Sequence, residues 1–281
     1  AVGKISSLIH QLKDNKLQGN TSIGHTRWAT HGKPSSINAH PFVKKNCALV
    51  HNGIIENHDD LINTHYINKN NLHSQTDTEV VAEIYSTLLD EYNPIEALIS
   101  LMSKVEGTYA FAFLVKGTSS IYAARKGSPL VIGLSEKTKA ISSDILGLPG
   151  NITQTIFLEE NDIVEINNSF LSIFNTRGEK IEREVHSHTS KNEFNTKGSF
   201  KHFMQKEIYH QPISIEDTIL NYCDKKTSQV FLPKHEVDFN SVSSLHLAAC
   251  GTAYHACMIA KYWFEEFTNI HTSIDIGSEF R

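Results

Sequence analysis

The feature that most constrains the fold is a run of seven short β-type segments in the middle of the chain. Each is rich in β-branched or aromatic residues, and Gly, Asn or Pro separates most of them. Strands with such short connections pair as antiparallel neighbours. The segments are 109–115, 120–124, 130–133, 140–142, 155–158, 162–166 and 170–174.

Helical patterns precede this run. Thr76 and Glu79 have the spacing of a capping box, in which two side chains bond the free N–H groups at the start of a helix. Pro94 opens a second helix, and we expect an amphipathic helix at 3–12 and a short strand at 47–50. Helices followed by a strand meander predict an α+β domain with helices packed on antiparallel sheets.

The last third of the chain has a different pattern. Residues 179–199 are polar and predict a linker, and 200–208 predict a helix that ends near Pro212. Further on, 245–249 resembles a buried strand, and a Gly-Thr turn, an apolar-faced helix and a strand follow, as in a parallel sheet. We therefore expect a first domain at 1–178, a linker with connecting helices at 179–240, and the start of a second domain at 241–281.

Composition narrows the class of protein. The 281 residues carry a net charge of −5 with Lys and Arg scattered, which argues against nucleic-acid or membrane partners. No apolar run approaches the ~20 residues of a membrane span. The four cysteines show neither a CxxC spacing nor the density of a disulfide scaffold, so we expect a reducing, cytoplasmic setting. They are Cys47, Cys223, Cys250 and Cys257.

Polar and aromatic residues gather in two early stretches, 23–32 and 50–58, beside short apolar runs. Buried polar groups need partners, and a small polar ligand is one such partner. Arg27 stands out because a guanidinium matches a carboxylate through two parallel hydrogen bonds, and Trp28 beside it would exclude water. We therefore predict a binding pocket here. The alternative is a surface arginine over a core tryptophan.

Three further motifs have both a chemical and a structural interpretation. Asn52 and Gly53 would supply a side-chain amide and a backbone N–H to an oxyanion hole, or they would form a hairpin turn. Asp77 would contact a ligand, or it would be only a favourable charge in the first turn of a helix. The residues 250–252 precede a helix and suit a phosphate, unless Thr252 is only the N-cap of that helix.

The histidines do not predict a metal site. Their intervals fit no metal-binding pattern and no cysteine cluster joins them, so we expect no metal and interpret them as pocket-lining or structural. They are His25, His31, His40, His51 and His58. Cys47, Cys250 and Cys257 are expected to be buried structural thiols, and no nucleophile is evident.

Four early motifs resemble the class II glutamine amidotransferase domain. They are HTRWATHG at 25–32, NAHP at 38–41, HNGIIENH at 51–58 and TDTE at 76–79. The resemblance implies the fold of the N-terminal-nucleophile hydrolases, an αββα sandwich.

The same resemblance implies a part for each pocket residue. Arg27 would hold the α-carboxylate of L-glutamine, Asp77 would hold its α-amino group, and Asn52 and Gly53 would form the oxyanion hole. The further pocket-lining residues that it implies are Trp28, Thr30 and His31.

Three later motifs resemble the glutamine–fructose-6-phosphate aminotransferases (isomerising). They are HFMQKEI at 202–208, CGTAY at 250–254 and SEFR at 278–281. This resemblance implies a sugar-isomerase domain with a doubly wound parallel α/β sheet, in which Cys250, Gly251 and Thr252 bind the sugar phosphate. Many members have Ser where Ala253 stands, so a phosphate contact from that hydroxyl is lost, or it is made by Thr252 and backbone N–H groups.

The implied reaction hydrolyses L-glutamine and passes ammonia to fructose 6-phosphate, giving D-glucosamine 6-phosphate and L-glutamate. It needs no cofactor, and the full-length enzyme is expected to be a homo-oligomer. The alternatives are another class II amidotransferase, such as a purine-pathway or asparagine-forming one, or a non-catalytic module that binds glutamine or sugar phosphate.

The nucleophile of this family is an N-terminal Cys, whereas the chain begins at Ala1 without an initiator Met or a signal-peptide pattern. It stops at Arg281, directly after a predicted strand that nothing in the sequence covers. We therefore expect an internal fragment that does not hydrolyse glutamine by itself, because amide hydrolysis needs a nucleophile with a base beside it.

Overall fold

The structure, a computed structural model, describes residues 2–14, 18–27, 32–64, 67, 71–187, 197–223, 227, 229–230 and 238–280. The chain divides into two compact units, Ala1–Ser199 and Phe200–Arg281. Within the described residues, no helix has the length and apolar character needed to cross a membrane.

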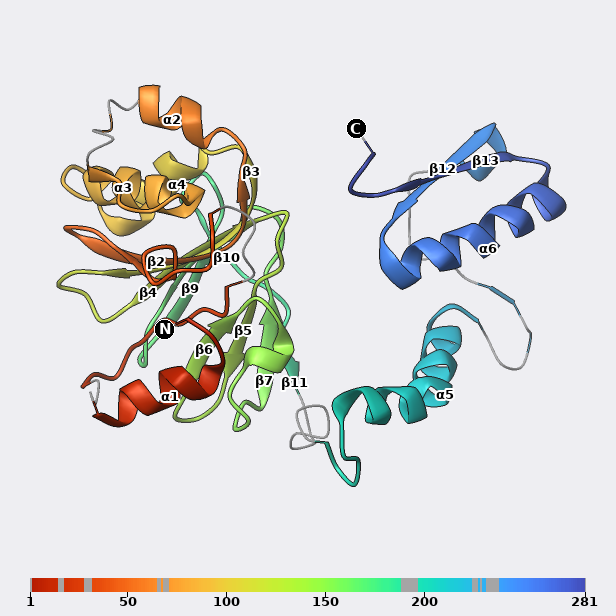
Figure 1. Ribbon diagram of the computed structural model, residues 1–281, viewed down its shortest axis with the longest axis horizontal. Coiled ribbons are helices and arrows are strands. Elements are labelled where there is room, and N and C mark those ends of the chain that lie inside the picture. The colour runs from red at the N-terminus through yellow and green to blue at the C-terminus, as the bar shows by residue number, and fades with distance from the viewer. Residues whose placement is uncertain are drawn as a thin grey trace. The chain divides into compact units, whose positions relative to one another are not determined.

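Two antiparallel sheets form the centre of the first unit (Figure 1). The larger has the strand order β1-β2-β3-β4-β8-β9-β10, and the smaller has the order β11-β7-β5-β6. The seven predicted β segments are all confirmed, with ends shifted by one or two residues. The strands are β1 Phe42–Val43, β2 Cys47–Ile55, β3 Gly107–Val115, β4 Ile121–Lys126, β5 Val131–Leu134, β6 Lys139–Ser142, β7 Gln154–Phe157, β8 Ile163–Ile166, β9 Leu171–Phe174, β10 Lys180–Ile181 and β11 His186–Ser187.

Helices complete the layered α+β architecture, the αββα arrangement expected from the resemblance. They are α1 Ile5–Asp14, α2 His58–Thr64, α3 Asp77–Leu88 and α4 Pro94–Met102. The helices α3 and α4 lie against the larger sheet (Figure 1). At the smaller sheet, α1 borders a cavity of about 510 Å³ that is also lined by the end of β6, although Ile5 and Leu8 on its apolar face are exposed.

Alternation along β3 explains how the layers pack. Tyr109, Phe111 and Phe113 are fully buried in the core cluster that includes the helices, whereas Ala110 belongs to the cluster shared with the smaller sheet. Successive side chains of a strand point to opposite faces, so large aromatic rings face the helices and small residues face the second sheet. Tyr85 of α3 packs against Phe113 with ring centroids 4.0 Å apart and the ring planes tilted by 36°, which joins helix and sheet.

Part of the predicted linker belongs to the first unit. β10 pairs with β9 and β11 pairs with β7, so the linker prediction is wrong for these strands. Between them, Arg183 donates through Nε and Nη2 to the two oxygens of the buried Asp162, at 2.9 and 2.8 Å. A bidentate pair of this kind is among the stronger charged hydrogen bonds, and it holds a polar sequence onto the sheets.

The second unit contains α5 Phe203–Tyr222, β12 Ser244–Ala249, α6 Gly251–Thr268 and β13 His271–Ile276. β12 and β13 pair in parallel on either side of α6 in sequence, which confirms the predicted βα unit. The prediction that the first helix ends near Pro212 is wrong, because α5 continues through this residue. Proline removes one helical hydrogen bond and bends a helix without always ending it, and Figure 1 shows α5 bent.

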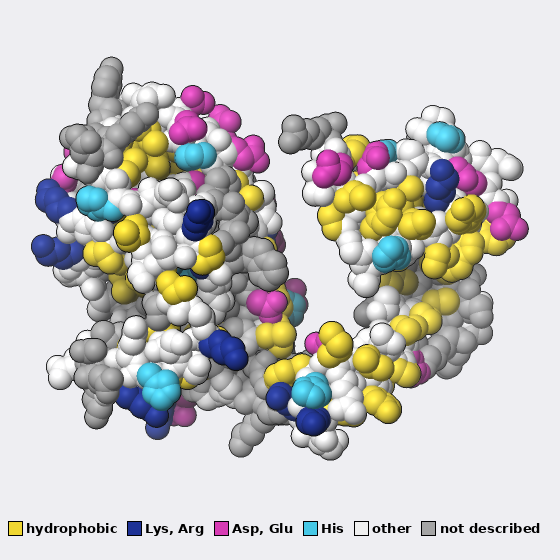
Figure 2. All heavy atoms as spheres, in the orientation of Figure 1, with side chains coloured by type: hydrophobic (Ala, Val, Ile, Leu, Met, Phe, Trp, Pro, Cys, Tyr) yellow, Lys and Arg dark blue, Asp and Glu magenta, His cyan; other side chains and the backbone are white. Residues whose placement is uncertain are grey.

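Apolar side chains remain exposed on the second unit. Figure 2 shows hydrophobic groups gathered over α6, where Tyr262, Trp263 and Phe267 are among the exposed residues. The described part of this unit has a sheet of two strands. A parallel sheet normally has both faces covered, and two strands with one crossover helix leave much apolar surface uncovered.

Asn52 and Gly53 lie inside β2, so the hairpin-turn alternative is wrong. They pair with Ala110 and Tyr109 of β3. Gly53 has φ of +142°, and a Cβ at this position would stand 2.0 Å from the carbonyl oxygen of Thr108. Only glycine permits this approach of the two backbones.

We predict that Gly53→Ala lowers the free energy of unfolding by at least about 3 kcal/mol, from left-handed strain and overlap together. Gly117→Ala is the matched control, since Gly117 also has positive φ but no atom within 4 Å of the added Cβ. It should cost about 1 kcal/mol. Urea unfolding measures both, and equal losses would contradict the role of the Thr108 contact.

Candidate active site

A cavity of about 300 Å³ lies where β2, the start of α3 and the segment before residue 28 meet. It brings together Arg27, Asn52, Gly53 and Asp77, four residues that were predicted from separate motifs. Its other lining residues are His25, Thr26, His40, His51, Ile54, Thr76, Thr78 and Thr108. The remaining predicted pocket residues, Trp28, Thr30 and His31, lie outside the described residues.

Asp77 is the first residue of α3 and is 6% exposed. Its Oδ2 accepts a hydrogen bond of 2.7 Å from the N–H of Ile55, and its Oδ1 accepts one of 2.9 Å from the N–H of Thr78. The carboxylate therefore joins α3 to the end of β2 while it borders the cavity. Asp77 does more than place a charge in the first turn.

Arg27 borders the same cavity from a segment without helix or strand. Its Nη2 donates to the carbonyl of Gly32 at 3.3 Å. A guanidinium and a carboxylate in one small cavity complement the carboxylate and ammonium groups of a free amino acid.

The start of α3 is confirmed, but the capping box is wrong in its hydrogen bonds. Thr76 is the N-cap residue, yet its side chain makes no capping bond and pairs with Ser74 Oγ at 2.9 Å. The Glu79 carboxylate instead accepts the N–H groups of His73 and Ser74 and a bond of 2.9 Å from Lys44 Nζ. The bond from Lys44 to Glu79 could not be predicted from the sequence, because the two residues are 35 positions apart in the chain.

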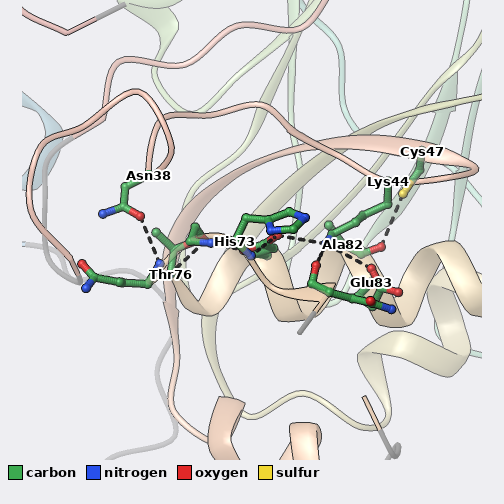
Figure 3. A network of polar contacts seen from close by, with 11 residues as sticks. Asn38, Lys44, Cys47, His73, Thr76, Ala82 and Glu83 are labelled. Atoms are coloured by element: carbon green, nitrogen blue, oxygen red, sulfur yellow. Dashed lines mark hydrogen bonds and ion pairs between the residues drawn. The ribbon is translucent and has the colours of Figure 1, made fainter. Parts of the chain in front are cut away.

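The physical reason for this departure is the burial of Glu79, whose side chain is 5% exposed. A buried carboxylate needs several donors, and one N–H of a capping box would not suffice. Burial raises the pKa of Glu79, but the bonds from His73, Lys44 and Ser74 outweigh burial and lower it to about 2. Lys44 is also 3.1 Å from Glu83, and Figure 3 shows it beside Glu83.

Three histidines line the cavity, which confirms the pocket-lining interpretation for them. The rings of His25 and His40 lie 4.1 Å apart, and His51 Nδ1 is hydrogen-bonded to Thr78 Oγ1 at 2.9 Å. Both ring nitrogens of His40, and His51 Nε2, are buried without a hydrogen-bond partner among the described residues. Each of these nitrogens therefore leaves its hydrogen-bonding capacity unused.

Burial lowers the pKa of all three imidazoles, and the positive charges of neighbouring groups lower the pKa of His40 further, to about 3. They are therefore neutral at physiological pH. His58 lies elsewhere, with its Nδ1 on the carbonyl of Ile55, and His31 is outside the described residues. In the described part of the chain, no three His, Cys, Asp or Glu side chains are grouped to hold a metal ion.

All four cysteines are described, and none lines this cavity. Cys47 is buried as predicted, its thiol donates to the carbonyl of Ala82, and burial raises its pKa to about 12. A thiol of this kind is not a nucleophile. The prediction of burial is wrong for Cys250, which is exposed at the N-cap of α6, and for Cys257, which is only partly buried.

At the start of α6, Cys250 is the N-cap and Gly251 is the first helical residue, with φ of +60°. Thr252 lies inside the helix, so the alternative that it is only an N-cap is wrong. All three residues are exposed at this N-terminus.

Residues 25–149 match the family model of the glutamine amidotransferase domain. The matched stretch contains Arg27, Asn52, Gly53 and Asp77, which meet in the cavity. Residues 25–149, within the first unit, therefore carry a glutamine amidotransferase domain.

A more particular likeness extends over the whole chain. It is 39% identical to the glutamine–fructose-6-phosphate aminotransferase (isomerizing) of Bradyrhizobium diazoefficiens and 40% identical to that of Acinetobacter baylyi. The alignments include all of this chain but 47% and 46% of those proteins, so the chain spans about half their length. Among solved structures, glutamine phosphoribosylpyrophosphate amidotransferase from B. subtilis aligns with 90% of this chain and 50% of its own, at 16% identity and a TM-score of 0.46.

We predict that His40 makes stability depend on pH below neutrality. Its pKa is about 6.5 in an unfolded chain and about 3 here. Between these values the unfolded chain binds a proton that the folded chain does not, so stability falls as pH drops from 6.5, by up to ~1.4 kcal/mol per pH unit. Over pH 6.5 to 4.5, the unfolding free energy of His40→Gln should fall less steeply than that of the parent. Parallel profiles in urea titrations would show that His40 is not responsible.

Proposed function

We propose that this chain is the glutamine-hydrolysing part of a glutamine–fructose-6-phosphate aminotransferase. The observation that carries the proposal is a single cavity that holds Arg27, Asp77 and the Asn52–Gly53 pair. The names of the full-length relatives support the choice of this enzyme over the purine-pathway and asparagine-forming amidotransferases.

In the proposed complex, Arg27 binds the α-carboxylate of L-glutamine and Asp77 binds the α-amino group. The side chain of glutamine then extends toward β2, where the Asn52 amide and the Gly53 N–H stabilise the oxyanion of the tetrahedral intermediate. Trp28, Thr30 and His31 remain predicted lining residues of the same pocket. The neutral imidazoles of His40 and His51 supply further hydrogen-bonding atoms at its wall.

The attacking thiol is proposed to come from an N-terminal Cys of the whole enzyme, as the resemblance implies. The high pKa of Cys47 and its bond to Ala82 support this choice over an internal cysteine. Ammonia released from glutamine then passes to fructose 6-phosphate, which yields D-glucosamine 6-phosphate.

The second unit is proposed to begin the sugar-isomerase domain at 241–281, after a linker with connecting helices that follows the amidotransferase domain. Its parallel βα unit supports this assignment. Cys250, Gly251 and Thr252 at the N-terminus of α6 would bind the sugar phosphate, since exposed N–H groups and the helix dipole favour an anion. The proposal includes a homo-oligomeric, cytoplasmic enzyme, and four free cysteines support that location.

The test of the glutamine site is Arg27→Lys in the full-length protein. The charge is kept but the bidentate contact is lost, which costs about 2–3 kcal/mol, or roughly 30- to 150-fold in kcat/KM for glutamine. Arg177→Lys is the control, because Arg177 is exposed and pairs with Glu179 away from the cavity. Steady-state ammonia release measures both variants. A parent-like kcat/KM in Arg27→Lys would remove Arg27 from the site.

A further inference from the structure

Arg27 and Asp77 must stand a fixed distance apart if they are to bind the two ends of one amino acid. Asp77 is held by α3 and by the N–H of Ile55. Arg27 lies on a segment of another kind, since residues 21–27 and 32–35 form neither helix nor strand. Side-chain contacts must therefore fix this part of the wall relative to α3.

Asn38 makes the contacts that join the two segments. Its Oδ1 accepts a hydrogen bond of 3.0 Å from the N–H of Gln75, two residues before Asp77. Its Nδ2 donates a hydrogen bond of 2.9 Å to the carbonyl of Lys33. Asn38 is 4% exposed, and Figure 3 shows its amide directed at the segment before Thr76.

The contacts continue to Arg27 on one side. Arg27 donates to the carbonyl of Gly32, which packs tightly against Asn38 and Gln75. A Cβ at Gly32 would stand 2.7 Å from Asn38 Nδ2 and 3.0 Å from Gln75 Cβ. A residue larger than glycine at this position would therefore displace the Asn38 amide or Gln75.

On the other side, Glu79 anchors the segment that Asn38 binds. Its buried carboxylate accepts the N–H groups of His73 and Ser74, directly before Gln75. Gln75 is thus bonded to the Asn38 amide through its own N–H, and the two residues before it are bonded to the Glu79 carboxylate. The segment 73–76 therefore has a fixed place relative to α3.

We propose that Asn38 is a positioning residue that sets the distance between Arg27 and Asp77, and so makes the cavity selective for ligands with both a carboxylate and an α-ammonium group. This rests on the proposed function, in which those two residues bind glutamine. Asn38 itself does not line the cavity. A ligand bound by Arg27 alone can follow a displaced Arg27, whereas a ligand bound at both ends cannot.

The experiment compares two substrates in the full-length enzyme: L-glutamine, and 4-carbamoylbutanoate, which lacks the α-amino group. Ammonia release gives kcat/KM for each, and their ratio measures the preference for the ammonium group. In Asn38→Ala we expect this ratio to fall about tenfold through a higher KM for glutamine, with kcat within about twofold of the parent. A general loss of folded enzyme would lower both substrates equally and leave the ratio unchanged.

The matched control is Asn46→Ala. The Asn46 amide also bridges two segments, donating 2.9 Å to the carbonyl of Ser86 near the other end of α3, but it is far from the cavity lining. Its ratio should equal that of the parent. An unchanged ratio in Asn38→Ala, or an equal fall in Asn46→Ala, would overturn the assignment.

Asn38→Asp keeps the acceptor for Gln75 and loses the donor to Lys33, so its ratio should fall less, about threefold. If Asn38→Ala does not fold, a parent-like ratio in Asn38→Asp overturns the proposal. Asp77→Asn tests the proposed function separately, because it must lower the ratio if Asp77 binds the ammonium group. An unchanged ratio in Asp77→Asn would remove Asp77 from the site. If the ratio falls in Asp77→Asn but stays unchanged in both Asn38 variants, only the positioning role of Asn38 is overturned.

Discussion

The pairing of β2 with β3 is the constraint on which the first unit depends. It runs without interruption from Cys47 opposite Val115 to Ile55 opposite Gly107. This register turns the aromatic side chains of β3 toward the helices, where they form the core. It also brings Gly53 against Thr108 and leaves the N–H of Ile55 for Asp77. The same ladder therefore builds the core and the wall of the cavity.

Local patterns were sufficient to predict most elements of this unit. Strand alternation and helical spacing are properties of neighbouring residues, and the seven β segments and the helix start at Asp77 are confirmed. The failures involve distant partners. Asn52–Gly53 has the local signature of a turn, but β3 pairs with it and keeps it extended. Glu79 has the spacing of a capping box, but Lys44 and a preceding loop take its carboxylate. At Pro212 the helix α5 continues, because a proline can bend a helix without ending it.

The candidate site was also predictable only in part. The residues alone left a purely structural explanation open for each of Arg27, Asn52, Gly53 and Asp77, and only the resemblance assigned all four to one ligand. In the structure these four residues line one cavity. Asn38 and Lys44 were not predicted as individual residues, because each bonds backbone groups or a carboxylate on a segment distant in sequence. No spacing rule connects such pairs, so they became visible only with the fold.

The close approach of Gly53 to Thr108 also limits how the pocket can change as sequences diverge. A wall made of side chains can be reshaped by one substitution, whereas here the contact is between two main chains. Every larger residue at Gly53 meets the carbonyl of Thr108, and every residue at Thr108 presents the same carbonyl. Substitutions can therefore alter the side chains around the cavity, such as Arg27, Asn52 and Asp77, but they leave this main-chain contact unchanged as long as the β2–β3 register is kept. Altered ligand preference in a descendant of this chain must arise from those side chains.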